Sequence, residues 1–222
     1  MSAVSTKNRG TGTATWPPLA PKRYEDGALV MVDADGILCP SHAAFEEEAV
    51  RLGFDKPPYN YPMGRDLVHW FNDADVGCTL DELLDLFKAA HERYMDIEPY
   101  EGAVHVLNGL QEDYPDLHVW YVSSRNESTE PTFRQWIAEN GFPWPENVVA
   151  MLSKEPWIEE NRPNVVIDDR VRTLVNARLD GAVGIALRQH HNVNLMRELP
   201  DIHIEPDWDS IGARVREALD NL

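Results

Sequence analysis

The chain has 222 residues, of which 43% are hydrophobic and 26% are charged. These values are typical of a folded globular protein and exclude a fibrous or largely disordered chain. Acidic side chains number 38 against 20 basic ones, and the formal net charge of −18 disfavours extended nucleic acid as a partner. No segment has the roughly 18 consecutive apolar residues of a membrane span, so we expect no membrane partner.

Residues 1–24 are rich in Ser, Thr and Gly and lack the apolar run of a signal peptide, so we interpret them as a flexible leader. Residues 25–222 are then expected to form one domain of ordinary size. Cys39 and Cys78 are the only cysteines, too few for a disulfide framework. Two free thiols indicate a reducing compartment, and we predict a cytoplasmic protein.

Short apolar runs alternate with helical patterns along the chain. The runs predicted to be strands lie at residues 29–32, 117–122, 148–151, 165–167 and 183–187. Such alternation predicts an α/β fold, a Rossmann-like parallel sheet with helices on both faces. Residues 41–100 have a mostly helical pattern, interrupted by a proline-rich loop at 56–64, and are expected to form an inserted helical cap.

Polar side chains follow three of these runs directly: Asp33 and Asp35, Ser123 and Ser124, and Asp168 and Asp169. In open parallel sheets the carboxyl ends of the strands form the ligand crevice. Residues that are about 90 and 45 positions apart in sequence are therefore expected to converge there. Each motif alone is short, and their convergence carries the functional interpretation.

The residue types suit phosphoryl chemistry. The carboxylate of Asp33 can attack phosphorus and form an aspartyl-phosphate. Asp35 can protonate the leaving oxygen and then deprotonate the attacking water. Asp33, Asp168 and Asp169 repel one another and require a cation, for which oxygen ligands and a bound phosphate favour Mg²⁺. Hydroxyl and amide groups after the second run, together with Lys154, can hold the remaining phosphoryl oxygens.

The haloacid dehalogenase superfamily of phosphatases has four ordered motifs, and this chain resembles it in DADGIL at 33–38, VSSR at 122–125, Lys154 and VIDD at 166–169. The resemblance implies that Asp33 is the nucleophile and Asp35 the general acid and base, whose backbone carbonyl also binds Mg²⁺. It further implies that Asp168 and Asp169 bind the metal.

The same resemblance assigns the phosphate-holding pair to Ser123 and Lys154, with two alternatives left open. The serine register can slip by one residue to Ser124, although we favour Ser123. Arg162 lies nearer in sequence to the acidic pair and is the alternative to Lys154.

The segments 98–103 and 185–192 further resemble the 5′-nucleotidase and deoxyribonucleotidase branch of the superfamily. That resemblance implies a small phosphorylated substrate, a nucleoside monophosphate, and another phosphometabolite is the alternative. His42, Phe45, Trp70 and Arg125 are candidate substrate contacts in or beside the cap, although core packing and solvated surface positions are the alternatives for such residues. A homodimer is compatible with this interpretation.

Other classes of protein fit less well. The Asp-x-Asp-Gly segment is not an EF-hand loop, since Gly36 stands at the fourth position rather than the sixth. No Gly-x-Gly-x-x-Gly follows the first strand, which disfavours a dinucleotide-binding oxidoreductase. A phosphomutase would use the same core, and a non-catalytic nucleotide-binding protein remains the alternative from another class.

Overall fold

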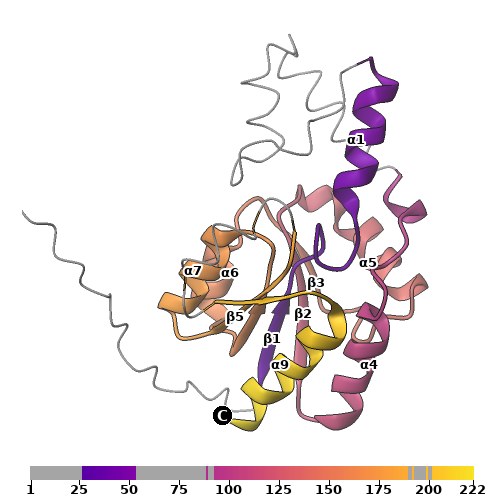
Figure 1. Ribbon diagram of the computed structural model, residues 1–222. Coiled ribbons are helices and arrows are strands. Elements are labelled where there is room, and N and C mark those ends of the chain that lie inside the picture. Colours follow the sequence, from indigo (N-terminus) through magenta and orange to yellow (C-terminus); the bar gives the residue numbers. More distant parts are fainter. Residues whose placement is uncertain (1–26, 54–88, 90–92, 190–191, 193–198, 200–201) are drawn as a thin grey trace, which may run out of the picture.

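The computed structural model describes residues 27–53, 89, 93–189, 192, 199 and 202–222, and of residues 42–46 only the backbone. Its centre is a parallel sheet of six strands in the order β3-β2-β1-β4-β5-β6 (Figure 1). The strands are β1 (Leu29–Val32), β2 (His118–Ser123), β3 (Val148–Ala150), β4 (Val165–Ile167), β5 (Val183–Leu187) and β6 (Ile202–Glu205). The predicted α/β fold with a parallel sheet is confirmed.

Helices cover both faces of this sheet, as predicted (Figure 1). The helical elements are α1 (Ser41–Arg51), η1 (Tyr94–Asp96), α4 (Ala103–Asp113), η2 (Glu127–Thr129), α5 (Glu130–Glu139), α6 (Glu155–Asn161), α7 (Val171–Leu179) and α9 (Trp208–Asp220). The helices α4, α5 and α9 pack on one face, and α6 and α7 pack on the other. None of the helices in the described part of the chain is long and apolar enough to cross a membrane.

The central strand β1 is buried on both sides, which explains its continuous apolar sequence. Successive side chains of a strand point to opposite faces of the sheet. Val30 and Val32 accordingly join the core beneath α4, α5 and α9, whereas Leu29 and Met31 join the core beneath α6 and α7. A strand covered on both faces needs apolar residues at every position, and all four are at most 1% exposed.

The neighbours of β1 determine which residues meet at the carboxyl edge of the sheet. Val32 of β1 lies beside Tyr121 of β2 and Ile167 of β4. The residues that follow these three strands therefore lie next to one another, although they are far apart in sequence.

Two elements were not predicted from the sequence. The edge strand β6 alternates apolar and polar residues over only four positions, too short a pattern to stand out. The helix α6 has seven residues and accounts for the long stretch between Lys154 and Asp168. The predicted leader at 1–24 and most of the predicted cap at 41–100 lie outside the described residues, and α1 is the first described element of that cap segment.

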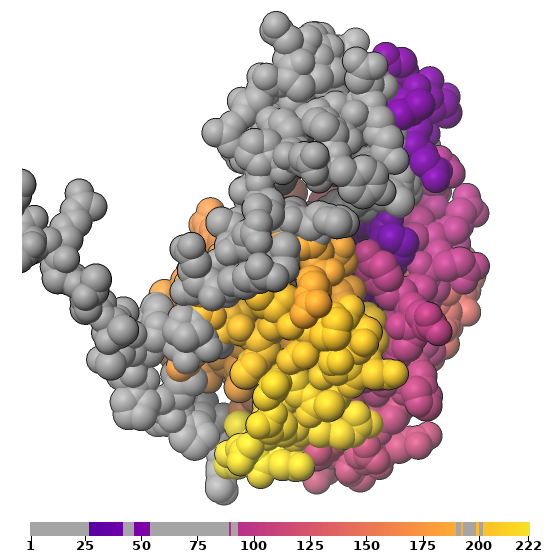
Figure 2. Space-filling view, viewed as in Figure 1, coloured from indigo at the N-terminus to yellow at the C-terminus, as the bar shows by residue number. Residues whose placement is uncertain are grey.

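The helices α4 and α9 pack closely on the same face of the sheet (Figure 2). Gly212 of α9 lies against Val106 of α4, and a Cβ at position 212 would lie 2.7 Å from Val106 Cγ1. A Cβ at Gly109 of α4 would meet only the end of the Arg216 side chain, at 3.2 Å. Packing therefore requires a glycine at position 212 but not at position 109.

We predict opposite effects of alanine at these two helical glycines. Gly212→Ala should lower the free energy of unfolding by about 1–3 kcal/mol, because the added methyl group overpacks a closed interface. Gly109→Ala should raise it by about 0.5–1 kcal/mol, because alanine is the better helix former and the Arg216 side chain can move. Urea unfolding of both variants measures these changes, and a stabilising Gly212→Ala would contradict the close packing.

Candidate active site

Three buried carboxylates lie together at the carboxyl edge of the sheet. Asp33 follows β1, and Asp168 and Asp169 follow β4. Each offers a carboxylate oxygen, and these oxygens all lie within 4.8 Å of one another. The three residues are only 3%, 0% and 5% exposed, so water screens their mutual repulsion poorly. The sequence-based expectation that these strand ends converge agrees with this geometry.

Lys154 supplies the positive charge within this cluster. Its ammonium nitrogen lies 2.6 Å from Asp33 Oδ1 and 2.7 Å from Asp168 Oδ2. The residue is 2% exposed and immediately precedes α6. Arg162, the alternative considered from the sequence, lies at the other end of α6 and lines a pocket away from the carboxylates. Lys154 is therefore the residue that contacts the predicted nucleophile.

Backbone amides fix the orientation of two of these carboxylates. The amide of Ala34 donates to Asp33 Oδ1 at 2.7 Å, and the amide of Arg170 donates to Asp168 Oδ1 at 2.8 Å. The side chain of Asn192, which is fully buried, donates to the backbone carbonyl of Asp169 at 3.4 Å. Asn192 was not predicted as a site residue, and it links the loop after β5 to the carboxylate cluster.

Lys154 does not offset the burial of Asp33 and Asp168. The pKa of Asp33 is raised to about 7, chiefly by burial and also by the neighbouring Asp168, Asp169 and Asp35, although Lys154 opposes the shift. Burial likewise raises the pKa of Asp168. A raised pKa means that the surroundings disfavour the ionised form. The cluster therefore carries more negative charge than its surroundings stabilise.

This charge excess and the all-oxygen donor set fit a divalent cation such as Mg²⁺. Asp33, Asp168 and Asp169 are the described residues whose carboxylates are close enough to share one ion. The fit rests on the donor chemistry and on the uncompensated charge of the cluster, and it agrees with the cofactor predicted from the sequence.

Asp35 follows Asp33 by two residues but has a different partner. Arg125 Nε donates to Asp35 Oδ2 at 2.7 Å, and the Arg125 Nη2 group bonds the other carboxylate oxygen. The hydroxyl of Ser123, which is fully buried, donates to Asp35 Oδ2 at 3.3 Å. Ser123, rather than Ser124, therefore contacts a predicted catalytic carboxylate.

Arg125, a candidate substrate contact from the sequence, has a side chain that is 3% exposed and pairs with Asp35. The sequence does not reveal this pairing because the direction of a loop side chain depends on tertiary packing. A contact between Arg125 and substrate stays a prediction. His42 and Phe45 lie in α1, where only the backbone is described, and Trp70 lies outside the described residues.

The turn that carries Asp35 is held by distant parts of the chain. Gly36 has a φ of +77°, a conformation that favours glycine. Three successive carbonyls of this turn accept hydrogen bonds: Gly36 from the Gln189 side chain, Ile37 from the Trp208 indole and Leu38 from the Tyr100 amide, at 3.1, 2.9 and 2.8 Å. These anchors were not predicted, and no local pattern in the sequence indicates them. They leave the Asp35 turn little freedom to move.

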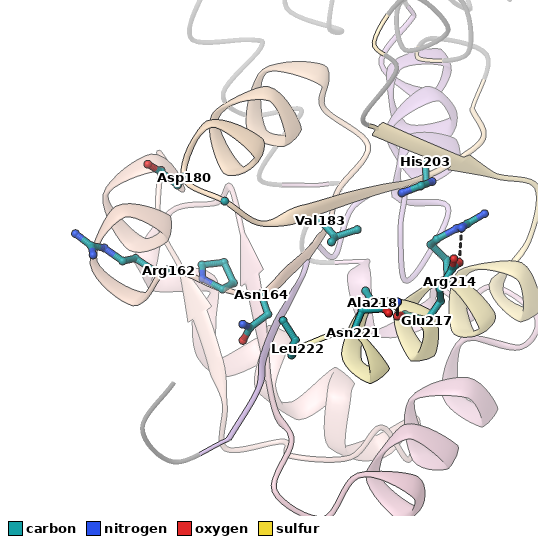
Figure 3. Close-up of a pocket in the computed structure, with 12 residues that line it drawn as sticks. Arg162, Asn164, Asp180, Val183, His203, Arg214, Glu217, Ala218, Asn221 and Leu222 are labelled. Atoms are coloured by element: carbon teal, nitrogen blue, oxygen red, sulfur yellow. Dashed lines mark hydrogen bonds and ion pairs between the residues drawn. The ribbon is translucent and has the colours of Figure 1, made fainter. Parts of the chain in front are cut away.

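A pocket of about 310 Å³ lies near the opposite, amino end of the strands (Figure 3). Asn164 and Val183, which stand at the beginning of β4 and β5, line it. Arg214, one of its charged lining residues, pairs with Glu205 and Glu217. Arg162 and Asp180 point away from the pocket centre in Figure 3. Its lining includes none of the carboxylates of the cluster at the carboxyl edge of the sheet.

Comparisons with known proteins identify the fold. Neither a protein-family model nor a curated protein sequence matches the chain. Solved structures match over most of its length, among them a haloacid dehalogenase-like protein of unknown function from Agrobacterium tumefaciens. That structure is 13% identical, covers 86% of this chain and 98% of its own, and has a TM-score of 0.62.

Two further matches carry phosphate-containing ligands. A hydrolase of the same family from Deinococcus radiodurans, solved with phosphate and sodium, is 14% identical, covers 87% of this chain and 96% of its own, and has a TM-score of 0.60. A variant of CbbY from Rhodobacter sphaeroides, in complex with xylulose 1,5-bisphosphate, is 14% identical, covers 83% and 96%, and has a TM-score of 0.58. The chain thus has the fold of haloacid dehalogenase-like hydrolases.

The raised pKa of Asp33 predicts a pH-dependent effect of Asp33→Asn on stability. The folded state holds a proton on Asp33 up to about pH 7, whereas the usual value is 3.8. Between these two pH values the folded state therefore binds more protons than the unfolded state. The stability that this bound proton contributes is lost as pH rises from 3.8 to about 7. Without metal, Asp33→Asn should be more stabilising near pH 8 than near pH 4.5, by at least about 1 kcal/mol.

Urea unfolding in EDTA at both pH values measures this difference. Asn keeps an acceptor for the Ala34 amide, and Lys154 keeps Asp168 as its partner, so the variant is expected to fold. Adding Mg²⁺ near pH 8 should raise the melting temperature of the wild type more than that of the variant, as expected for a lost metal ligand. An effect of Asp33→Asn that does not change with pH would contradict the charge imbalance.

Proposed function

We propose that the protein is a Mg²⁺-dependent phosphomonoester hydrolase that acts through an aspartyl-phosphate. The observation that carries this proposal is the position of Asp33, a carboxylate paired with Lys154 and placed beside Asp168 and Asp169 at the carboxyl edge of the sheet. Asp35 stands two residues away, at the opening of the site. The haloacid dehalogenase-like fold supports hydrolase activity at this edge.

In the first half-reaction a carboxylate oxygen of Asp33 attacks the phosphorus atom. The bond between phosphorus and the ester oxygen breaks, and that oxygen leaves with the electron pair and takes a proton from Asp35. Lys154 and the hydroxyl of Ser123 lie close enough to these carboxylates to hold phosphoryl oxygens during the transfer.

In the second half-reaction water attacks the phosphorus of the aspartyl-phosphate. Its proton passes to Asp35, the bond between phosphorus and the Asp33 oxygen breaks, and inorganic phosphate leaves. A Mg²⁺ ion held by Asp33, Asp168 and Asp169 would neutralise the charge of the phosphoryl group during both steps.

The substrate class is the finer part of the proposal. The resemblance of residues 98–103 and 185–192 to nucleotidases favours a nucleoside 5′-monophosphate. A sugar phosphate is the second candidate, because CbbY, which has the same fold, was solved with a pentulose bisphosphate. Both are small phosphate monoesters that the same carboxylates can attack.

We expect the protein to release phosphate from small monoesters when Mg²⁺ is present and to lose this activity in EDTA. The measurement is phosphate release from a panel of ribo- and deoxyribonucleoside monophosphates and sugar phosphates. Asp33→Asn should lower kcat by at least about 10⁴-fold, since an amide is a poor nucleophile, and should remain folded.

The panel separates the candidate substrate classes. Release concentrated on nucleotides supports a nucleotidase, whereas release concentrated on sugar phosphates keeps the mechanism and replaces that substrate. Asp220→Asn is a matched control, because Asp220 is the last residue of α9 and its carboxylate bonds the Tyr114 hydroxyl. Full activity of Asp33→Asn, or release that EDTA leaves unchanged, would contradict the proposed mechanism.

A further inference from the structure

Arg125 holds both oxygens of the Asp35 carboxylate. Its Nε atom lies 2.7 Å from Asp35 Oδ2, and its Nη2 group bonds Asp35 Oδ1. Two parallel hydrogen bonds from one planar guanidinium fix a carboxylate in direction as well as in position. The Arg125 side chain is 3% exposed and that of Asp35 is 26% exposed, so a buried cation holds a carboxylate that still reaches solvent.

The aromatic rings of Tyr94 and Phe133 lie against the Arg125 guanidinium. Arg125 Cζ lies 3.8 Å from the centroid of the Tyr94 ring and 5.3 Å from that of Phe133. Such stacking favours one plane for the guanidinium. Tyr94 is itself buried, and its hydroxyl accepts a hydrogen bond from the Cys39 thiol at 3.1 Å. The plane of Arg125 is thus set by the core of the protein.

We propose that Arg125 is a positioning residue, which fixes the Asp35 carboxylate for the second half-reaction, the attack of water on the aspartyl-phosphate. This inference rests on the proposed function and adds to it the residue that orients the base. In that step water forms a bond to phosphorus, its proton moves to Asp35, and the Asp33 oxygen leaves with the electron pair.

The first half-reaction depends on other contacts. Asp33 is held by the Lys154 ammonium at 2.6 Å and by the Ala34 amide at 2.7 Å. Phosphoryl transfer from an activated aryl phosphate needs no proton for its leaving group, so Asp35 is not required there. Loss of Arg125 should therefore slow the second half-reaction selectively.

A direct contact between Arg125 and substrate is the competing role. The Nε and Nη2 groups of Arg125 are already engaged by Asp35, and one face of the guanidinium lies on Tyr94. The Arg125 side chain is also only 3% exposed, which leaves its remaining N–H groups little access to a substrate. The geometry favours action through Asp35, and the two roles differ in the half-reaction that they affect.

The test is pre-steady-state hydrolysis of an activated aryl phosphate in the presence of Mg²⁺ by Arg125→Met in the full chain. We expect phenolate release to begin with a burst of about one equivalent per active site, because phosphoryl transfer remains intact. The steady-state rate should then fall about 10–100-fold below that of the wild type, as for a misoriented catalytic group. The phosphorylated protein should accumulate and be trapped by acid quenching.

Three variants serve as controls. Asp35→Ala should show the same burst. The double variant with Arg125→Met and Asp35→Ala should turn over as fast as Asp35→Ala alone, since Arg125 acts through Asp35. Arg125→Lys keeps the charge but cannot make the bidentate contact, so its turnover should lie between those of the wild type and Arg125→Met. Should Arg125→Met fail to fold, Arg125→Lys carries the test, with its own burst of about one equivalent and slowed turnover.

Three results would overturn the inference. A burst amplitude that falls in proportion to turnover would indicate a merely structural role, and a slower burst with a raised KM would indicate a substrate contact. Unchanged turnover would show that Arg125 has no part in the reaction. Different results would contradict the proposed function itself: a wild type that hydrolyses no phosphate ester, or an Asp33→Asn variant that retains activity.

Discussion

The repulsion among Asp33, Asp168 and Asp169 is the constraint on which the site depends. The sheet brings the ends of β1 and β4 together. The carboxylates that follow these strands are buried, so water screens the repulsion between their charges poorly. Lys154 compensates only part of that charge, although it contacts two of the three. Such an arrangement costs stability unless something else binds. Binding of a cation and a phosphoryl group, as proposed, would offset this cost.

The sequence predicted the sheet because burial on both faces requires continuous apolar runs, as in β1. It also predicted which side chains meet, since the residues that follow parallel strands share one edge of the sheet. It did not predict β6, an edge strand of four residues of which only Ile202 is buried. Nor did it place Arg125, because the direction of that side chain depends on Tyr94, which is 31 positions away in sequence and carries no motif.

The anchors of the Asp35 turn were missed for a similar reason. Trp208 begins the last helix and Gln189 follows β5, so neither lies near the acidic motif in sequence. Their hydrogen bonds to the carbonyls of Ile37 and Gly36 depend on the fold, which brings these distant segments together. The burial that makes Trp208 part of the core also places its one polar group, which must find an acceptor. Packing on this face of the sheet and the shape of the Asp35 turn are thus linked.

Asp33 and Asp35 belong to one turn, yet their surroundings differ. Asp33 is buried against Lys154, which it shares with Asp168, whereas Asp35 reaches solvent and pairs with Arg125, whose guanidinium is stacked on Tyr94. A lysine is a point charge that can shift from a carboxylate to a phosphoryl group, while a guanidinium favours one planar geometry. The proposed nucleophile therefore has a partner that can follow the transferring group, and the proposed base has a partner that keeps it in one orientation. This difference would allow two carboxylates two residues apart to serve different halves of the proposed reaction.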